Sequence, residues 1–186
     1  MSSSKLELII GPMFSGKSTE LIRKIRLAKT IDKKVLVIKP IIDVRYKNNK
    51  IVSHSFESEE CESVEQLSEI EDKINNYDLI VIDEGQFFPD LKQYVLKWVE
   101  INNKEVIVGG LDGDSKRNPI GQILELIPYS DSCIKINSLC KKCNNGTQAI
   151  FTHRTNDNQE QVQIGGAESY MALCRKHFLD FNSYIT

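Results

Sequence analysis

The sequence has neither an excess of basic residues nor a long apolar segment. Its 24 Lys and Arg residues stand against 26 Asp and Glu residues, which gives a formal net charge of −2. Because binding to a nucleic acid depends on neutralising its phosphates, we expect no nucleic-acid partner. No apolar run approaches the roughly 18 residues that cross a bilayer, and the run from Leu6 to Ile10 is too short for a signal peptide. We therefore expect a cytoplasmic protein with no membrane partner.

Cysteine is scarce, internal repeats are missing and no segment is of low complexity. The five cysteines are an odd number, and in a reducing compartment their spacing favours metal ligation over disulfides. Hydrophobic residues make up 40% of the 186 residues and charged residues 27%, which is typical of a globular protein. This length suits one domain with a small addition.

Short apolar runs alternate with amphipathic segments through the first two thirds of the chain. Strands are predicted at 6–10, 35–38, 79–82 and 106–108, and helices at 18–30, from Pro89 onward and at 120–127. Val64, Leu67 and Ile74 repeat at roughly helical spacing. Continuous apolar strands separated by helices favour a parallel sheet covered on both faces. The predicted fold class is α/β, a doubly wound parallel sheet.

The pattern changes near Cys133, and apolar residues become sparse from Cys140 onward. Segments 147–152 and 161–164 look like the two strands of a hairpin. Such a region buries little core, so another element must hold it together. We predict an α/β domain over 1–137, a small domain over 138–178 and a short tail over 179–186.

The segment from Gly11 to Ser18 reads GPMFSGKS and matches a phosphate-binding P-loop. A predicted strand precedes it and a predicted helix follows it, as this motif requires. The glycines allow backbone N–H groups to surround phosphate oxygens at the positive end of the helix. Lys17 would contact the β and γ phosphates, and the Ser18 hydroxyl would bind Mg²⁺. The alternative is a simple glycine turn between strand and helix.

Two acidic residues, Asp83 and Glu84, end the third predicted strand. An aspartate at this place binds the metal in P-loop enzymes, and ligands bind at the carboxyl ends of such strands. Glu84 could then act as a general base. The alternative is a pair of solvated acids at the end of a strand.

Two pairs of metal-binding residue types occur in the C-terminal region. Cys140 and Cys143 form one pair and Cys174 and His177 the other, which suits a closed tetrahedral zinc site. A redox CxxC is the competing interpretation, but that motif normally opens a helix in a βαβ unit. The sequence thus favours structural zinc that staples the base of a loop.

These motifs, together with four further segments, resemble the type II thymidine kinases in order and spacing. The further segments are DEGQFF from Asp83, GLDG from Gly110, RNPIG from Arg117, and IGG from Ile164 ahead of Tyr170. The resemblance covers residues 5 to 177. It implies a P-loop domain with a zinc-stapled lasso, and transfer of the γ-phosphate of MgATP to thymidine, with deoxyuridine as a further substrate. It also implies that the protein is a homotetramer and acts in nucleotide salvage. It further implies that dTTP, the end product, inhibits the enzyme.

The resemblance assigns roles to individual residues. Glu84 resembles the base for the 5′-hydroxyl and is the catalytic candidate together with Lys17. The backbone at 161–164 resembles the lasso strand that reads thymine, and Gln86 resembles a position in the thymidine pocket. The candidate cofactor-binding residues are Gly11, Pro12, Met13, Phe14, Ser15, Gly16, Lys17, Ser18, Asp43, Arg45, Asp83 and Gln86. The candidate substrate-binding residues are Met13, Phe87, Leu111, Ser115, Gln161, Val162, Gln163, Ile164, Gly165 and Tyr170. The expected metal ligands are Cys140, Cys143, Cys174 and His177 for zinc, and Ser18 and Asp83 for magnesium.

The chain departs from the family pattern at Ser115, where members often carry an aromatic residue. Three other functions share part of these motifs. A P-loop ATPase would use Glu84 to activate water; a switch GTPase would need an NKxD motif, which NKEV at Asn103 does not supply. A zinc-ribbon nucleic-acid adaptor conflicts with the nearly neutral charge.

Overall fold

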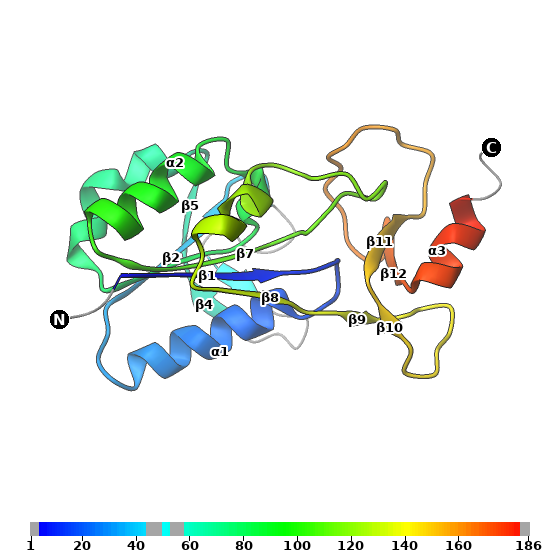
Figure 1. Cartoon of the computed structure of the whole chain (residues 1–186), viewed down its shortest axis with the longest axis horizontal. Coiled ribbons are helices and arrows are strands. Elements are labelled where there is room, and N and C mark those ends of the chain that lie inside the picture. The colour runs from blue at the N-terminus through cyan, green and yellow to red at the C-terminus, as the bar shows by residue number, and fades with distance from the viewer. Residues whose placement is uncertain (1–3, 44–49, 53–57, 183–186) are drawn as a thin grey trace.

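A sheet of six parallel strands forms the centre of the structure. The computed structural model describes residues 4–43, 50–52 and 58–182 (Figure 1). The sheet order is β5-β2-β6-β7-β1-β8, and every neighbouring pair is parallel. Its strands are β1 (Lys5–Ile10), β2 (Val35–Pro40), β5 (Glu62–Val64), β6 (Leu79–Ile82), β7 (Glu105–Gly110) and β8 (Ser132–Lys135). The predicted α/β class with a parallel sheet is thereby confirmed.

Helices cover both faces of this sheet because its inner strands are apolar on both sides. Helix α1 (Lys17–Lys29) buries Leu21, Ile22 and Ile25 against one face. The other face carries α2 (Leu91–Leu96), the π-helical turn η3 (Lys97–Ile101) and the 3₁₀ helices η1 (Leu67–Asn76) and η4 (Ile123–Tyr129). Figure 1 shows α1 and α2 on opposite sides of the sheet. A further 3₁₀ turn, η2 (Gly85–Phe87), follows β6.

The edges of the sheet differ from the prediction. Val64, which repeats with Leu67 at helical spacing, lies at the end of strand β5 and not in a helix. Strand β8 was not predicted. Helix η4 starts at Ile123 and not at Ile120. Both edge strands are short and mostly half-buried or exposed, so they lack the continuous apolar run that marks the inner strands. A separate antiparallel pair, β3 (Lys50–Val52) and β4 (Ser58–Glu60), lies beside α1.

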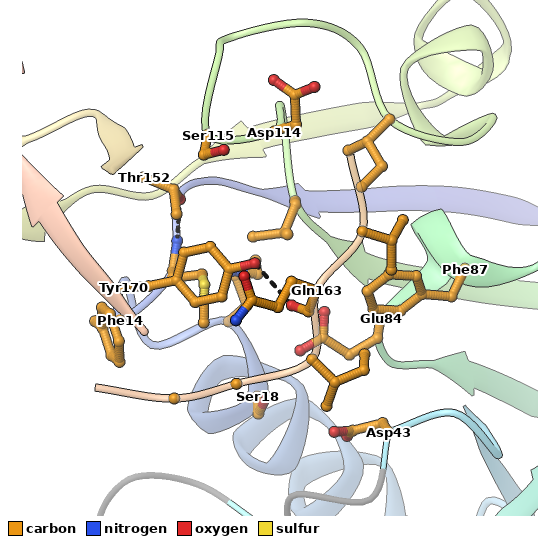
Figure 2. A pocket seen from close by; sticks show the side chains of 18 of the residues that line it. Phe14, Ser18, Asp43, Glu84, Phe87, Asp114, Ser115, Thr152, Gln163 and Tyr170 are labelled. Carbon is orange, nitrogen blue, oxygen red and sulfur yellow. Dashed lines mark hydrogen bonds between the residues drawn. The ribbon is translucent and has the colours of Figure 1, made fainter. Parts of the chain in front are cut away.

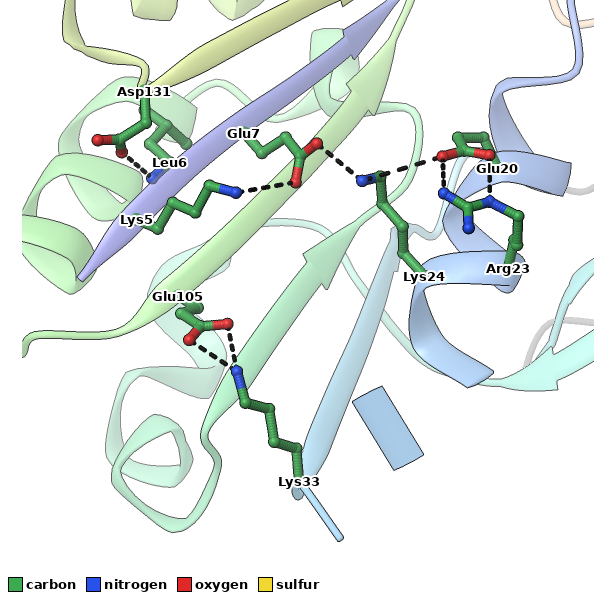
Figure 3. Close-up of polar contacts among 9 residues, drawn as sticks. All are labelled: Lys5, Leu6, Glu7, Glu20, Arg23, Lys24, Lys33, Glu105 and Asp131. Atoms are coloured by element: carbon green, nitrogen blue, oxygen red, sulfur yellow. Dashed lines mark hydrogen bonds and ion pairs between the residues drawn. The ribbon is translucent and has the colours of Figure 1, made fainter. Parts of the chain in front are cut away.

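Charged residues connect β1 to α1 (Figure 3). Glu7 of β1 is largely buried, and its carboxylate lies 2.8 Å from the Lys24 ammonium of α1. Lys5 lies 3.8 Å from the same carboxylate. On the outer side of the helix, Glu20 pairs with Arg23 at 2.7 Å, and the hydrogen bonds from Arg23 lower the pKa of Glu20. The strand and helix on either side of the glycine loop are thus joined by an ion pair that is mostly shielded from water.

The C-terminal region forms a separate group of small elements, at the right of Figure 1. Strand β9 (Ser138–Leu139) pairs with β10 (Gln148–Ala149), and β11 (Phe151–Arg154) pairs with β12 (Tyr170–Leu173), both antiparallel. Helix α3 (Arg175–Asn182) follows. The predicted strand at 161–164 is wrong: this segment carries no strand, and β12 pairs with β11 instead. Because β12 buries Tyr170, Ala172 and Leu173, it gains more by pairing than the polar segment 161–164 would.

The helices of the described residues are short or polar. None of them is both long enough and apolar enough to cross a bilayer.

Candidate active site and metal site

The predicted P-loop connects the end of β1 to the start of α1, as expected. A Cβ atom at Gly11 would overlap the carbonyl oxygen of Ile136, so no larger residue fits there. Gly16 has φ +87°, a left-handed conformation that favours glycine. The hydroxyl oxygen of Ser15 is buried and has no hydrogen-bond partner among the described residues. A phosphate oxygen bound in the loop would satisfy this hydroxyl, so the loop fits a nucleotide phosphate.

Lysine and serine at the start of α1 face the acidic end of β6. Lys17 is buried, and its ammonium donates to the Pro12 carbonyl at 2.9 Å, across the loop. The Ser18 hydroxyl donates to the Asp83 carboxylate at 2.9 Å. A hydroxyl beside a carboxylate offers the oxygen ligands that Mg²⁺ prefers. The residues present therefore fit a bound MgATP, with Ser18 and Asp83 on the magnesium side.

Glu84 occupies a strained position next to Asp83. Its φ is +51°, in the left-handed region where residues other than glycine are uncommon. The Gln86 amide donates to the Glu84 carboxylate at 2.7 Å and accepts from the Leu111 backbone N–H at 2.9 Å. This bridge fixes the carboxylate between η2 and the end of β7. Gln86, which does not line the cavity, thus positions the Glu84 carboxylate that does.

A cavity of about 480 Å³ contains both the loop and the acids. Figure 2 shows Glu84, Ser18, Asp43, Tyr170 and Gln163 around it. Its lining includes these predicted residues: Met13, Phe14, Gly16, Lys17, Ser18, Asp43, Asp83, Glu84, Phe87, Leu111, Ser115, Gln161, Val162, Gln163, Ile164, Gly165 and Tyr170. Four other predicted residues, Gly11, Pro12, Ser15 and Gln86, are not part of the lining. Arg45 lies outside the described residues.

Hydrogen bonds across this cavity join the sheet domain to the C-terminal elements. The Met13 backbone N–H donates to the Thr152 hydroxyl of β11 at 2.9 Å. Asp114 is buried and accepts from the Gln161 amide at 3.1 Å. Outside the cavity lining, the guanidinium of Arg117 lies over the Phe178 ring of α3, 5.1 Å from its centre. The predicted P-loop and the segment 161–164, which is predicted to contact the substrate, therefore meet at one cavity.

Three cysteines and one histidine come together where the C-terminal elements meet. The Nδ1 atom of His177 lies 3.5 Å from the sulfur of Cys140 and 3.4 Å from that of Cys143. All four ligand atoms, Cys174 included, lie within 4.8 Å of one another. Tetrahedral zinc, with bonds of about 2.3 Å to sulfur and 2.0–2.1 Å to nitrogen, needs ligand atoms about 3.5–3.8 Å apart. The four predicted ligands therefore fit a structural zinc ion.

Electrostatics at this cluster favour a cation. Burial raises the pKa of the Cys140 thiol, but hydrogen bonds to its sulfur, chiefly from backbone groups of Cys174 and Cys143, outweigh this and lower the pKa to about 6. The pKa of Cys143 is raised, first by burial and then by the two neighbouring cysteines. A thiolate at Cys140 disfavours a second thiolate at Cys143, and a bound divalent cation would remove that repulsion.

The chain is similar in sequence to known proteins over nearly its whole length. A family model described as thymidine kinase matches residues 4–178. The chain belongs to the thymidine kinase family. It is 40% identical to a thymidine kinase of Oryza sativa subsp. japonica over 95% of this chain and 66% of the rice protein. It is 39% identical to thymidine kinase a of Arabidopsis thaliana, over 95% of this chain and 76% of that protein. A thymidine kinase of Vaccinia virus (strain Western Reserve) is 38% identical over 97% of this chain and 99% of the viral protein. The predicted resemblance to type II thymidine kinases is confirmed.

One buried residue that the sequence did not indicate, Arg154, organises the C-terminal side of the cavity. Arg154 of β11 is buried, lines the cavity and stacks on the Tyr170 ring at 5.5 Å. It donates to the carbonyls of Asn158 at 2.7 Å and Glu160 at 2.6 Å. The alternating burial of β11 marks Thr152 and Arg154 as inward-facing. The sequence FTHR gives no signal of this, because its two buried positions are polar and run against the usual pattern of apolar residues on a buried face.

Proposed function

We propose that this chain transfers the γ-phosphate of MgATP to the 5′-hydroxyl of thymidine, giving dTMP and ADP. The observation that carries the proposal is one cavity that contains a P-loop with Lys17, the carboxylate of Glu84 and the segment 161–165. Deoxyuridine, which lacks only the thymine methyl group, is proposed as a further substrate. The names of the relatives support the choice of nucleoside.

Each group has a defined task in the proposed reaction. The 5′-oxygen of the nucleoside attacks the γ-phosphorus, its proton passes to Glu84, and the bond to the β-phosphate oxygen breaks to release ADP. Gln86 orients the Glu84 carboxylate through the 2.7 Å hydrogen bond. The Lys17 ammonium and the loop N–H groups stabilise the charge on the phosphates. Magnesium held by Ser18 and Asp83 would neutralise phosphate charge.

The resemblance supports further proposals of the same kind. We propose a structural zinc ion on Cys140, Cys143, Cys174 and His177, and a division into a kinase domain over 1–137, a lasso domain over 138–178 and a tail over 179–186. The predicted boundary falls between β8 and β9. We also propose Asp43 and Arg45 as phosphate-side residues, a cytoplasmic homotetramer that acts in nucleotide salvage, and feedback inhibition by dTTP.

A nucleoside panel with MgATP tests the central proposal. ADP formation should depend on thymidine or deoxyuridine and stop in Lys17→Ala, which lacks the charge on the phosphates. The kinase proposal is wrong if ADP forms at the same rate without any nucleoside. That result would favour an ATPase in which Glu84 activates water.

A further inference from the structure

Lys39, near the end of β2, is a charged residue in the interior of the sheet domain. Its side chain is only 1% exposed and is not part of the cavity lining. Val37, two residues earlier on the strand, packs in the apolar cluster that contains the buried residues of α1. Because alternate residues of a strand point to the same face, Lys39 points to the side on which the predicted P-loop enters α1. A buried ammonium is costly in free energy unless acceptors lie close by.

One acceptor of the Lys39 ammonium is the backbone carbonyl of Asp43, at 3.3 Å. The Asp43 backbone N–H donates to the Pro40 carbonyl at 3.0 Å, so residues 40–43 form a turn that the lysine holds from its buried side. The Asp43 side chain is buried and lines the cavity, as Figure 2 shows. The cation is thus connected to the cavity through the main chain of this turn.

The acidic groups of the proposed magnesium side lie near the same lysine. The Asp83 backbone N–H donates to the carbonyl of Ile38, the residue before Lys39, at 2.9 Å. Burial raises the pKa of the Cys61 thiol to about 11. The Lys39 ammonium opposes this rise, and the carboxylates of Asp83 and Asp43 add to it. All three charges therefore act on one buried thiol, and the lysine balances part of the acidic charge there.

We propose that Lys39 is a positioning residue for MgATP, an inference that rests on the proposed thymidine kinase function. Lys39 contacts no phosphate itself, because it does not line the cavity. It acts through Asp43: by holding the backbone carbonyl of that residue, it fixes the Asp43 carboxylate at the phosphate side. The C-terminal elements, which supply the proposed thymidine side of the cavity, take no part in this bond.

Removal of the ammonium tests the inference. Lys39→Met keeps most of the side-chain volume but cannot hold the Asp43 carbonyl. Its KM for ATP should rise roughly tenfold, the size expected for the loss of a hydrogen bond from a charged group, while the KM for thymidine stays within about twofold. Lys33→Met is the matched control, since Lys33 lies just ahead of β2, at the other end of the strand, and pairs with Glu105 at 2.6 Å (Figure 3). It should keep both KM values of the wild type.

A double-mutant cycle shows whether Lys39 acts through Asp43. Asp43→Ala keeps the backbone carbonyl but removes the carboxylate, so it should also raise the KM for ATP. Adding Lys39→Met to Asp43→Ala should then raise this KM less than about twofold further, because two residues that act as one unit are not additive. A further rise as large as that in Lys39→Met alone overturns the inference. A wild-type KM for ATP in Asp43→Ala overturns it as well, and this test needs no change at Lys39.

A lysine with a purely structural role predicts a different result. Lys39→Met would then lower the free energy of unfolding in urea and leave both KM values unchanged, which overturns the inference. If Lys39→Met does not fold, Lys39→Gln, which is uncharged and shorter, replaces it with the same expectation. An active wild type with an unchanged KM for ATP in the variant overturns the inference alone. A wild type that forms no ADP with any nucleoside overturns the kinase proposal, and the inference with it.

Discussion

Glu84 is the residue on which the proposed proton transfer depends. Glu84→Gln keeps the size of the side chain but cannot accept the 5′-hydroxyl proton. We expect kcat to fall by roughly 10²- to 10⁴-fold, the usual contribution of a positioned base, with the KM for ATP little changed. Steady-state kinetics with thymidine check this, and Glu125→Gln, an exposed glutamate bound to Lys92, is the control. If only the thymidine KM rises, Glu84 binds substrate and another group is the base.

Single residues were predictable where chemistry requires a fixed spacing. Lys17, Ser18, Asp83 and the expected zinc ligands come from such motifs, and the structure brings each set together. Arg154 was not predictable in this way. Its role depends on carbonyls at Asn158 and Glu160, which lie on a loop without a periodic pattern. Sequence spacing does not show which buried cation a loop will fold around.

Elements were predictable where a whole apolar run is buried. The run at Leu79–Ile82 matches β6 residue for residue, because that strand is covered on both faces. The edge strand β8 exposes most of its residues, so its sequence resembles a loop. The antiparallel pairing of β11 with β12 joins residues separated by the whole segment 155–169. Local pattern does not fix such long-range pairing, and the predicted strand at 161–164 was wrong for this reason.

The ion pair between β1 and α1 gives a prediction about stability (Figure 3). The Glu7 side chain is only 11% exposed. In Lys24→Met its carboxylate loses the near cation, and Lys5, 3.8 Å away, is the cation that remains in this network. We expect a loss of about 1–3 kcal/mol in the free energy of unfolding, because a largely buried charge loses its near partner. Arg23→Met, one position away, removes an exposed pair with Glu20 and should cost less than about 1 kcal/mol. Urea unfolding of both variants measures the difference, and equal losses would contradict it.

At the scale of the whole molecule, the site depends on two parts with unequal cores. The sheet domain has apolar clusters on both faces of its six strands. The C-terminal part buries a small cluster that includes Cys140, Leu173 and Phe178. That cluster contains two of the four expected zinc ligands, Cys140 and Cys174, so the small core and the metal cluster are one unit. The C-terminal part nevertheless supplies Thr152, Arg154, Gln163 and Tyr170 to the cavity.

Loss of the metal should therefore impair thymidine binding more than nucleotide binding. A structural zinc site contributes on the order of 10 kcal/mol or more to folding at neutral pH, which a core this small cannot replace. Cys143→Ser, like treatment with a chelator, should raise the thymidine KM steeply and lower kcat, while binding of an ATP analogue to the P-loop persists. Metal analysis should find about one zinc per chain in the wild type and less in Cys143→Ser. Cys133→Ser, which changes an exposed cysteine on β8 outside the cluster, should keep both zinc and activity. Full thymidine turnover by chelated, zinc-free protein would show that the zinc cluster does not support the substrate site.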